Sequence, residues 1–291
     1  MNTIKETCIY KNVNNCCIKA DLYLIENKKA PVIMYIHGGG LIWGSRESIL
    51  GQQVKLYNEA GFNVISIDYR VAPETKLESI LEDIKDAINW VKVECTKKYN
   101  INAEKIAVVG SSAGGYLALM TGTFVDKPKA IVSFYGYGNL LDDWCIQPHS
   151  FYCREIMIST KEAQNYVSDG AISEGGRERW LYYLYCRQKG VWTNEISGYD
   201  VVKDKEKLLD FCPINKIGKD YPPTMLLHGD KDDDVPFQES LLLKEKLDEM
   251  EVENKLILLK GKGHDFDCQM EDIEVKTAFN NVILFLKEHL R

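Results

Sequence analysis

A short glycine-rich motif at residues 110–114 (GSSAG) most strongly limits what this chain can fold into. It directly follows an apolar run at 105–110 (KIAVVG) and precedes a helical pattern at 113–123. A serine in a G-x-S-x-G motif between a buried strand and a helix is typical of a nucleophile elbow, a sharp turn that exposes the serine hydroxyl. The alternative is an ordinary strand-to-helix turn, or one that binds a phosphate. No Gly-Lys-Ser/Thr follows, which excludes a Walker-type nucleotide loop.

Strand and helix patterns alternate on both sides of this motif. Short apolar runs indicate buried strands, and apolar residues spaced three and four apart indicate amphipathic helices. The predicted strands are 8–12, 18–25, 31–36, 63–68, 105–110, 129–134, 223–228 and 255–259, and the predicted helices are 54–60, 77–92, 113–123, 237–250 and 273–289. This order predicts an α/β fold, with a mainly parallel sheet of about eight strands and helices on both faces.

The alternation stops between Tyr135 and Cys212, in a segment dense in aromatic residues. We therefore expect residues 1–136 and 214–291 to form the α/β core, and residues 137–213 to form a helical cap inserted into it. Aromatic side chains offer a large, stiff apolar surface with polar tips. They would either roof a binding pocket or form a small core within the cap, and the two roles are compatible.

Composition excludes several classes of protein. The 36 basic and 43 acidic residues give a net charge of −7 without a basic block, so we expect neither nucleic acid nor a membrane as a partner. No apolar run reaches the roughly 20 residues of a membrane helix, and no secretory signal is visible. Nine cysteines, an odd number, favour reduced thiols and a cytoplasmic location.

Residues suited to nucleophilic catalysis follow other predicted strands. Three glycines after His37 (HGGG, 37–40) leave backbone N–H groups free to face a developing oxyanion. A serine hydroxyl needs a base, and the base needs an orienting acid. His264, after the strand at 255–259, is the best-placed base. Four aspartates crowd the loop after the strand at 223–228; Asp232 is favoured as the acid, with Asp230 and Asp233 as alternatives.

Two other patterns suggest a metal site, but neither is complete. The spacing of Asp230, Asp232 and Asp234 is similar to that of a calcium loop, but no glycine follows Asp234 and the twelfth position is Leu241. The second pattern is Cys145, His149 and Cys153, which would share one helical face if Pro148 did not interrupt the helix. We predict no metal and no cofactor.

The motifs together resemble those of the α/β-hydrolase fold, in particular the hormone-sensitive-lipase-like carboxylesterases. The resemblance rests on HGGG (37–40), DYRVAPE (68–74), GSSAGG (110–115), the HG-x-x-D-x-x-VP pattern at 228–236 and GHDF (263–266). It implies a triad of Ser112 as nucleophile, Asp232 as acid and His264 as base. It also implies an oxyanion hole formed by the N–H groups of Gly39, Gly40 and Ala113, and structural roles for Asp68 and Arg70. The family usually has an acidic residue at the position of Ser111, and its cap lies largely at the N-terminus.

The resemblance implies a carboxylesterase that cleaves small-molecule esters through an acyl-enzyme. The aromatic segment suggests acyl groups of small to medium size. A peptidase, amidase or deacetylase with the same triad is the enzymatic alternative. A small-molecule receptor without catalysis is the other, although such relatives characteristically lose a triad residue. A homodimer is compatible with the sequence.

Overall fold

The computed structural model describes residues 4–27 and 29–290. It contains an eight-stranded sheet with the order β1-β2-β4-β3-β5-β6-β7-β8. The strands are β1 (Ile4–Val13), β2 (Cys16–Leu24), β3 (Val32–Ile36), β4 (Asn63–Ile67), β5 (Ile106–Ser111), β6 (Ala130–Phe134), β7 (Thr224–Gly229) and β8 (Asn254–Leu259). Neighbouring strands from β4 to β8 run parallel, whereas β2 is antiparallel to both β1 and β4. The predicted mainly parallel sheet is therefore confirmed.

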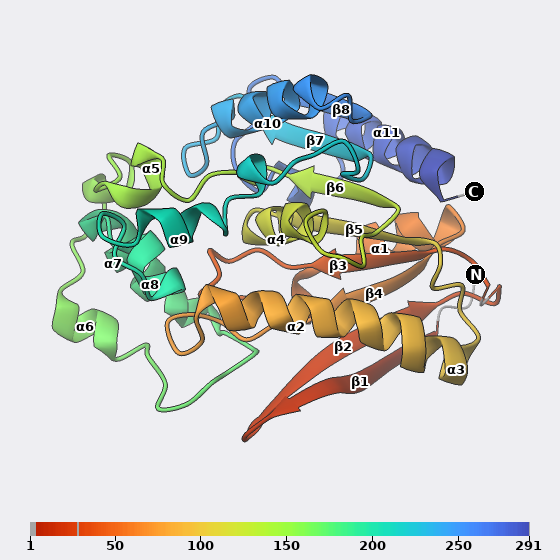
Figure 1. Cartoon of the computed structure of the whole chain (residues 1–291), viewed down its shortest axis with the longest axis horizontal. Coiled ribbons are helices and arrows are strands. Elements are labelled where there is room, and N and C mark those ends of the chain that lie inside the picture. The colour runs from red at the N-terminus through yellow and green to blue at the C-terminus, as the bar shows by residue number, and fades with distance from the viewer. Residues whose placement is uncertain (1–3, 28, 291) are drawn as a thin grey trace.

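Helices cover both faces of the sheet (Figure 1). On one face lie α2 (Leu77–Trp90), α4 (Ala113–Thr121) and α10 (Gln238–Glu249). On the other face lie α1 (Gly51–Glu59) and α11 (Ile273–His289). The side chains of β3 alternate between two apolar clusters, with Met34 in one and Ile33 in the other. Each cluster fills one face, because successive side chains of a strand point to opposite sides.

One predicted helix is longer than its sequence pattern indicated. The pattern predicted a helix over 77–92, but the helical backbone continues from α2 through a π-helical turn at Val91–Cys95 and α3 (Thr96–Tyr99). Val91, Cys95 and Tyr99 are buried. They are four residues apart, so the apolar stripe simply continues. The helix ends at Asn100, whose left-handed backbone (φ 56°) is a common C-terminal conformation.

Five α-helices lie between β6 and β7, in the segment that the sequence analysis assigned to a cap. They are α5 (Asp143–Ile146), α6 (Thr160–Gln164), α7 (Trp180–Lys189), α8 (Trp192–Ser197) and α9 (Lys205–Leu209). Figure 1 shows them gathered at the end of the sheet toward which the arrows of β6 and β7 point. We keep the name cap segment for residues 137–213, whose bounds as a separate unit stay a prediction.

Buried ion pairs hold the loops around the sheet. Asp68 accepts hydrogen bonds from the backbone N–H and the guanidinium of Arg46, and Arg70 pairs with the buried Asp83 at 2.8 Å. Asp68 and Arg70 are thus placed as structural residues, as the resemblance implied. Among residues 4–27 and 29–290, no helix has the length and apolar character needed to cross a bilayer. Each of the nine cysteines has a free thiol.

Candidate active site

The three residues predicted to form a triad meet at one edge of the sheet. Ser112 follows β5, Asp232 follows β7 and His264 follows β8, and carboxyl ends of parallel strands share one edge. The Nε2 atom of His264 lies 3.0 Å from Ser112 Oγ, and its Nδ1 atom lies 2.7 Å from Asp232 Oδ2. Because a carboxylate only accepts hydrogen bonds, Nδ1 carries the proton in this arrangement. Nε2 is then free to accept the proton of the serine hydroxyl.

Ser112 occupies a strained turn between β5 and α4. Its φ of 54° and ψ of −120° are unusual for a residue with a side chain, and such strain is typical of nucleophile elbows. Two glycines make the turn possible. A Cβ atom on Gly110 would lie 2.1 Å from the carbonyl oxygen of Gly114, and one on Gly114 would lie 2.0 Å from that of Ile36. Close packing therefore requires both glycines, Gly110 against the backbone of α4 and Gly114 against that of β3.

The structure distinguishes among the three candidate acids. The side chain of Asp232 is fully buried, and its Oδ1 atom accepts the N–H groups of Asp234 and Val235, each at 2.9 Å. Burial favours the neutral acid, but hydrogen bonds with His228 and His264 outweigh it and hold the pKa of Asp232 well below its usual range. Asp230 instead accepts the N–H of Gly261 at 2.6 Å.

The alternative acid Asp233 is exposed and lines the cavity described below. Of the three candidates, only Asp232 makes a hydrogen bond with His264 among the residues that the structure describes. The structure thus places Asp232, and neither alternative acid, within hydrogen-bonding distance of His264.

His264 lies in a strongly acidic environment. Burial lowers the pKa of its imidazole. The hydrogen bond with Asp232 and the charges of Asp234 and Asp265 outweigh burial and raise the pKa to about 9. Asp234 is the nearest of these on the serine side, with its Oδ2 atom 3.7 Å from Nε2. The positive form of the ring is therefore favoured near neutral pH.

The glycine loop after β3 carries the N–H groups predicted to form an oxyanion hole. Gly39 and Gly40 have left-handed backbones (φ 102° and 58°) and line the cavity. Their N–H groups have no hydrogen-bond acceptor among the residues that the structure describes. Ala113 opens α4, so its N–H has no acceptor within the helix either. None of the three N–H groups thus has a hydrogen-bond partner in the described part of the chain.

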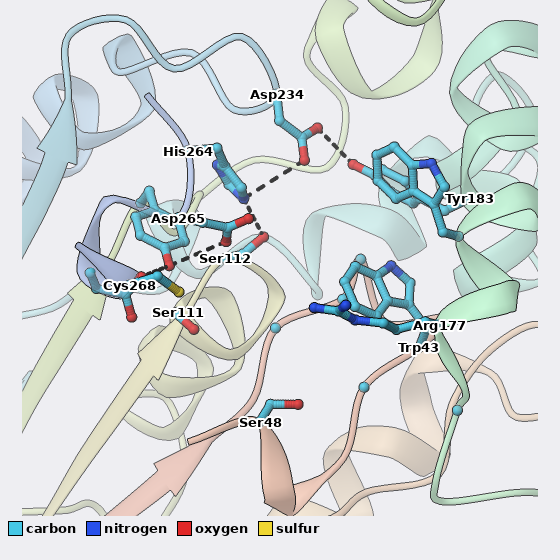
Figure 2. A pocket seen from close by; sticks show the side chains of 18 of the residues that line it. Trp43, Ser48, Ser111, Ser112, Arg177, Tyr183, Asp234, His264, Asp265 and Cys268 are labelled. Atoms are coloured by element: carbon cyan, nitrogen blue, oxygen red, sulfur yellow. Dashed lines mark hydrogen bonds and ion pairs between the residues drawn. The ribbon is translucent and has the colours of Figure 1, made fainter. Parts of the chain in front are cut away.

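Aromatic side chains of the cap segment both line a cavity and form a core, so the two roles considered for them coexist. A cavity of about 780 Å³ opens above Ser112 and His264, and Phe151, Tyr152, Trp180 and Tyr183 contribute to its wall. Trp192 is buried behind this wall. Figure 2 shows Trp43 and Arg177 across the cavity from His264. The cavity is of the size typical of small-molecule sites.

Three contacts between the cap segment and the site were not predicted from the sequence. Arg187 of α7 is fully buried and forms an ion pair with Asp234 at 2.8 Å. Tyr183, one turn earlier, donates its hydroxyl to the same carboxylate at 2.7 Å. The indole Nε1 of Trp192 donates to the carbonyl oxygen of Gly40 at 2.9 Å. The only local signal was a single arginine four residues after a tyrosine in an aromatic helix, which is insufficient to predict a partner 47 residues away.

The two patterns considered for metal binding serve other purposes. Asp230, Asp232 and Asp234 hold different partners, namely Gly261, His264 and Arg187. Cys145 is buried and its thiol contacts the carbonyl oxygen of Asn139. Neither set converges on a common point among the described residues.

The sequence matches two family models in succession. BD-FAE matches residues 20–163, and the Prolyl oligopeptidase family matches residues 156–291. Among curated proteins, non-reducing polyketide synthase atr1 of Stereocaulon alpinum is 29% identical over 305 residues, covering 91% of this chain and 12% of the synthase. Non-reducing polyketide synthase ausA of Emericella nidulans is 27% identical over 349 residues, covering 99% of this chain and 14% of that protein. The chain thus spans only a small part of these relatives.

Solved structures match almost the whole chain. A protein of unknown function from Staphylococcus aureus Mu50 superposes with a TM-score of 0.78 at 25% identity, covering 99% of this chain and 100% of the other. An α/β-hydrolase superfamily protein from Enterococcus faecalis superposes with a TM-score of 0.76 at 22% identity, covering 98% of this chain and 99% of the other. An acetyl ester-xyloside bifunctional hydrolase from Caldicellulosiruptor lactoaceticus superposes with a TM-score of 0.72 at 21% identity, covering 97% of this chain and 96% of the other.

The strand order and these matches define the fold. The chain has the α/β-hydrolase fold, which confirms the fold predicted from the sequence.

Proposed function

We propose that the protein hydrolyses carboxylic esters with small to medium acyl groups, using Ser112, His264 and Asp232 as its triad. The observation that carries the proposal is the unbroken chain from Ser112 Oγ through His264 to Asp232, at 3.0 and 2.7 Å. A nucleophile and its base within hydrogen-bonding reach, with the base oriented by an acid, is the arrangement that acyl transfer requires. Similarity in fold to an acetyl ester hydrolase supports an ester as the substrate.

In the proposed reaction, His264 Nε2 takes the proton of Ser112 as Oγ attacks the ester carbonyl carbon. The negative charge on the carbonyl oxygen is stabilised by the N–H groups of Gly39, Gly40 and Ala113. The imidazolium then gives its proton to the departing alkoxide, and the alcohol leaves. Water deprotonated by the same ring attacks the acyl-enzyme, the ring gives that proton to Ser112 Oγ as the ester bond breaks, and the acid is released. Asp232 stays ionised and stabilises the imidazolium in both halves.

The cavity supports a substrate of limited size. Its walls are aromatic on the cap side and polar beside Ser112, where the hydroxyl of Tyr35 lies 3.1 Å from Ser111 Oγ. A cavity of about 780 Å³ can hold a small-molecule ester.

Hydrolysis of p-nitrophenyl acetate, butyrate, octanoate and laurate by the unaltered protein and by Ser112→Ala tests the proposal. We expect turnover to peak on the short chains and to disappear in the variant. Ser111→Ala is the matched control, because it removes a neighbouring hydroxyl from the same turn and is expected to keep turnover. Ester hydrolysis that persists in Ser112→Ala would contradict the assignment of the nucleophile.

The match to the Prolyl oligopeptidase family makes an amide substrate the second candidate. Comparing kcat/KM on a p-nitrophenyl ester with that on an anilide of the same acyl group separates the two. A larger value on the anilide would favour the peptidase or amidase activity. A protein that turns over neither but binds small acyl compounds would be a receptor.

A further inference from the structure

Asp234 lies between the base of the site and the cap segment. Its Oδ2 atom is 3.7 Å from His264 Nε2, whereas its Oδ1 atom accepts hydrogen bonds from Tyr183 and Arg187 at 2.7 and 2.8 Å. Figure 2 shows the Asp234 carboxylate between His264 and Tyr183. The conventional triad makes no use of this second carboxylate.

Arg187 is fixed in its place by an unusual set of contacts. The guanidinium carbon lies 5.0–5.6 Å from the ring centres of Trp144, Tyr152, Tyr183 and Trp192. Its Nη2 atom also donates to the carbonyl oxygens of Trp144 and Asp234, at 3.1 and 3.3 Å. A buried arginine that is paired and stacked on aromatic faces has little freedom to move. Asp234 is therefore held at a defined distance from His264.

The imidazole of His264 has a carboxylate at each nitrogen. Asp232 faces Nδ1 within hydrogen-bonding distance, whereas Asp234 faces Nε2, the atom that exchanges protons with Ser112. At 3.7 Å, Asp234 is too distant for a hydrogen bond, so it acts through its charge. The other ionisable groups around the ring and around Asp234 are Asp265, Asp267 and Tyr135 on the side of β6 and β8, Lys231 and Asp233 in the loop after β7, and His149, Tyr152, Tyr183 and Arg187 in the cap segment.

We propose that Asp234 is a positioning residue that acts through His264, and that its charge, held in place by Arg187 and Tyr183, sets the pH range in which His264 can accept the proton of Ser112. The proposal rests on the ester hydrolysis proposed above. Its physical basis is that a nearby negative charge stabilises the imidazolium, both in the resting protein and in the transition state. In the resting protein, this stabilisation keeps His264 protonated. In the transition state, it lowers the barrier to proton transfer, so it raises kcat once His264 is neutral.

Removal of the Asp234 charge should therefore change two quantities in opposite directions. The acidic limb of the kcat/KM profile should move to lower pH, because His264 then loses its proton at a lower pH. The plateau value of kcat should fall, because the imidazolium formed during the attack loses a stabilising charge. A merely structural residue would lower activity without moving the limb.

The first experiment measures kcat/KM and kcat on p-nitrophenyl acetate against pH for Asp234→Asn. We expect the acidic limb to move down by about 1 to 2 pH units and the plateau kcat to fall about tenfold. Asp233→Asn is the matched control, because it removes the same charge from the adjacent position of the same loop, and we expect less than half of the shift. An unmoved limb in Asp234→Asn, or an equal shift in both variants, overturns the proposal.

A second variant addresses the buried charge that Asp234→Asn leaves on Arg187. The double change Asp234→Asn with Arg187→Met removes both charges, so no unpaired ion stays buried. We expect the same direction of shift in this variant. A double variant that folds and shows the acidic limb of its kcat/KM profile at the same pH as the unaltered protein overturns the proposal.

The titration of His264 can also be followed without turnover, by NMR of protein labelled at histidine and assigned through His264→Gln. We expect the resonance to titrate at lower pH in Asp234→Asn than in the unaltered protein, and equal titration midpoints overturn the proposal. A protein that hydrolyses no ester shows that the proposed function has failed, whereas the NMR midpoint still decides the role of Asp234. The two failures are thus distinguishable.

Discussion

The indole N–H of Trp192 donates a hydrogen bond to the carbonyl oxygen of Gly40 at 2.9 Å, joining the cap segment to the glycine loop after β3. The ring of Tyr183 packs on the same glycine, since a Cβ atom on Gly40 would lie 2.5 Å from it. Arg179 adds a third contact, from its Nε atom to the carbonyl oxygen of Ile42 at 2.7 Å. The cap segment therefore supports the loop whose N–H groups are proposed to bind the oxyanion.

Trp192→Phe should lower kcat while leaving the fold intact. The change keeps an aromatic ring but removes the donor from Gly40, so the loop loses one buried hydrogen bond. We expect a five- to tenfold fall in kcat, about the worth of one such bond. Trp90→Phe, the same change in α2 far from the site, should leave kcat unaffected. Steady-state kinetics with thermal denaturation of both variants measures the difference.

Asp232→Asn should reduce kcat by about 10³- to 10⁴-fold with a small change in KM. An amide at this position cannot hold the Nδ1 proton of His264, so the ring adopts the wrong tautomer or orientation. Asp230→Asn serves as the comparison, because its carboxylate accepts the N–H of Gly261 and makes no hydrogen bond with His264 among the described residues. A larger loss in Asp230→Asn than in Asp232→Asn would show that the wrong acid was chosen.

The raised pKa of His264 predicts opposite pH dependences for activity and stability. Activity needs the neutral ring, so kcat/KM should rise with pH between neutrality and the pKa of about 9. Stability follows the reverse direction. The folded pKa exceeds the usual value of about 6.5, so the protonated ring stabilises the folded state below that value, and this contribution is lost as pH rises through 9.

Urea denaturation at several pH values checks the stability part of this prediction. The free energy of unfolding of the unaltered protein should fall between pH 7 and 10 relative to that of His264→Gln, which lacks the titrating ring. Parallel curves for the two proteins would mean that His264 has an ordinary pKa in the folded state.

Gly114→Ala should destabilise the protein and abolish activity. The added methyl group would lie 2.0 Å from the carbonyl oxygen of Ile36, a backbone atom of the central strand that cannot move aside cheaply. We expect a loss of about 3 kcal/mol of unfolding free energy, as for other overpacked cores. Gly51→Ala, at a position where a Cβ meets nothing within 4 Å, should change stability by less than about 0.5 kcal/mol.

The regular part of the fold could be predicted well from the sequence. The strands of the central sheet are continuous apolar runs because both of their faces are buried, as in β3 and β5. Helix α11 has the predicted limits, 273–289. Helix ends set by tertiary burial were less accessible, and the helix from Leu77 continues to Tyr99 because residues beyond Lys92 still face the core.

The candidate triad could be predicted because each residue belongs to a local motif at the end of a strand. Ser112 has its glycines, Asp232 follows a strand and a histidine-glycine pair, and His264 follows a glycine. The supporting residues have no such signal. Arg187, Tyr183 and Trp192 act on residues 47, 51 and 152 positions away, so only the folded chain brings them to their partners.

The attachment of the cap segment to two loops beside the proposed triad limits how this protein could be re-engineered. Arg187 holds the loop of Asp234, and Trp192 holds the loop of Gly40. A cap grafted from a relative to alter substrate choice would remove both supports at once. A successful graft would have to replace the loop of Asp234 and the glycine loop together with the cap.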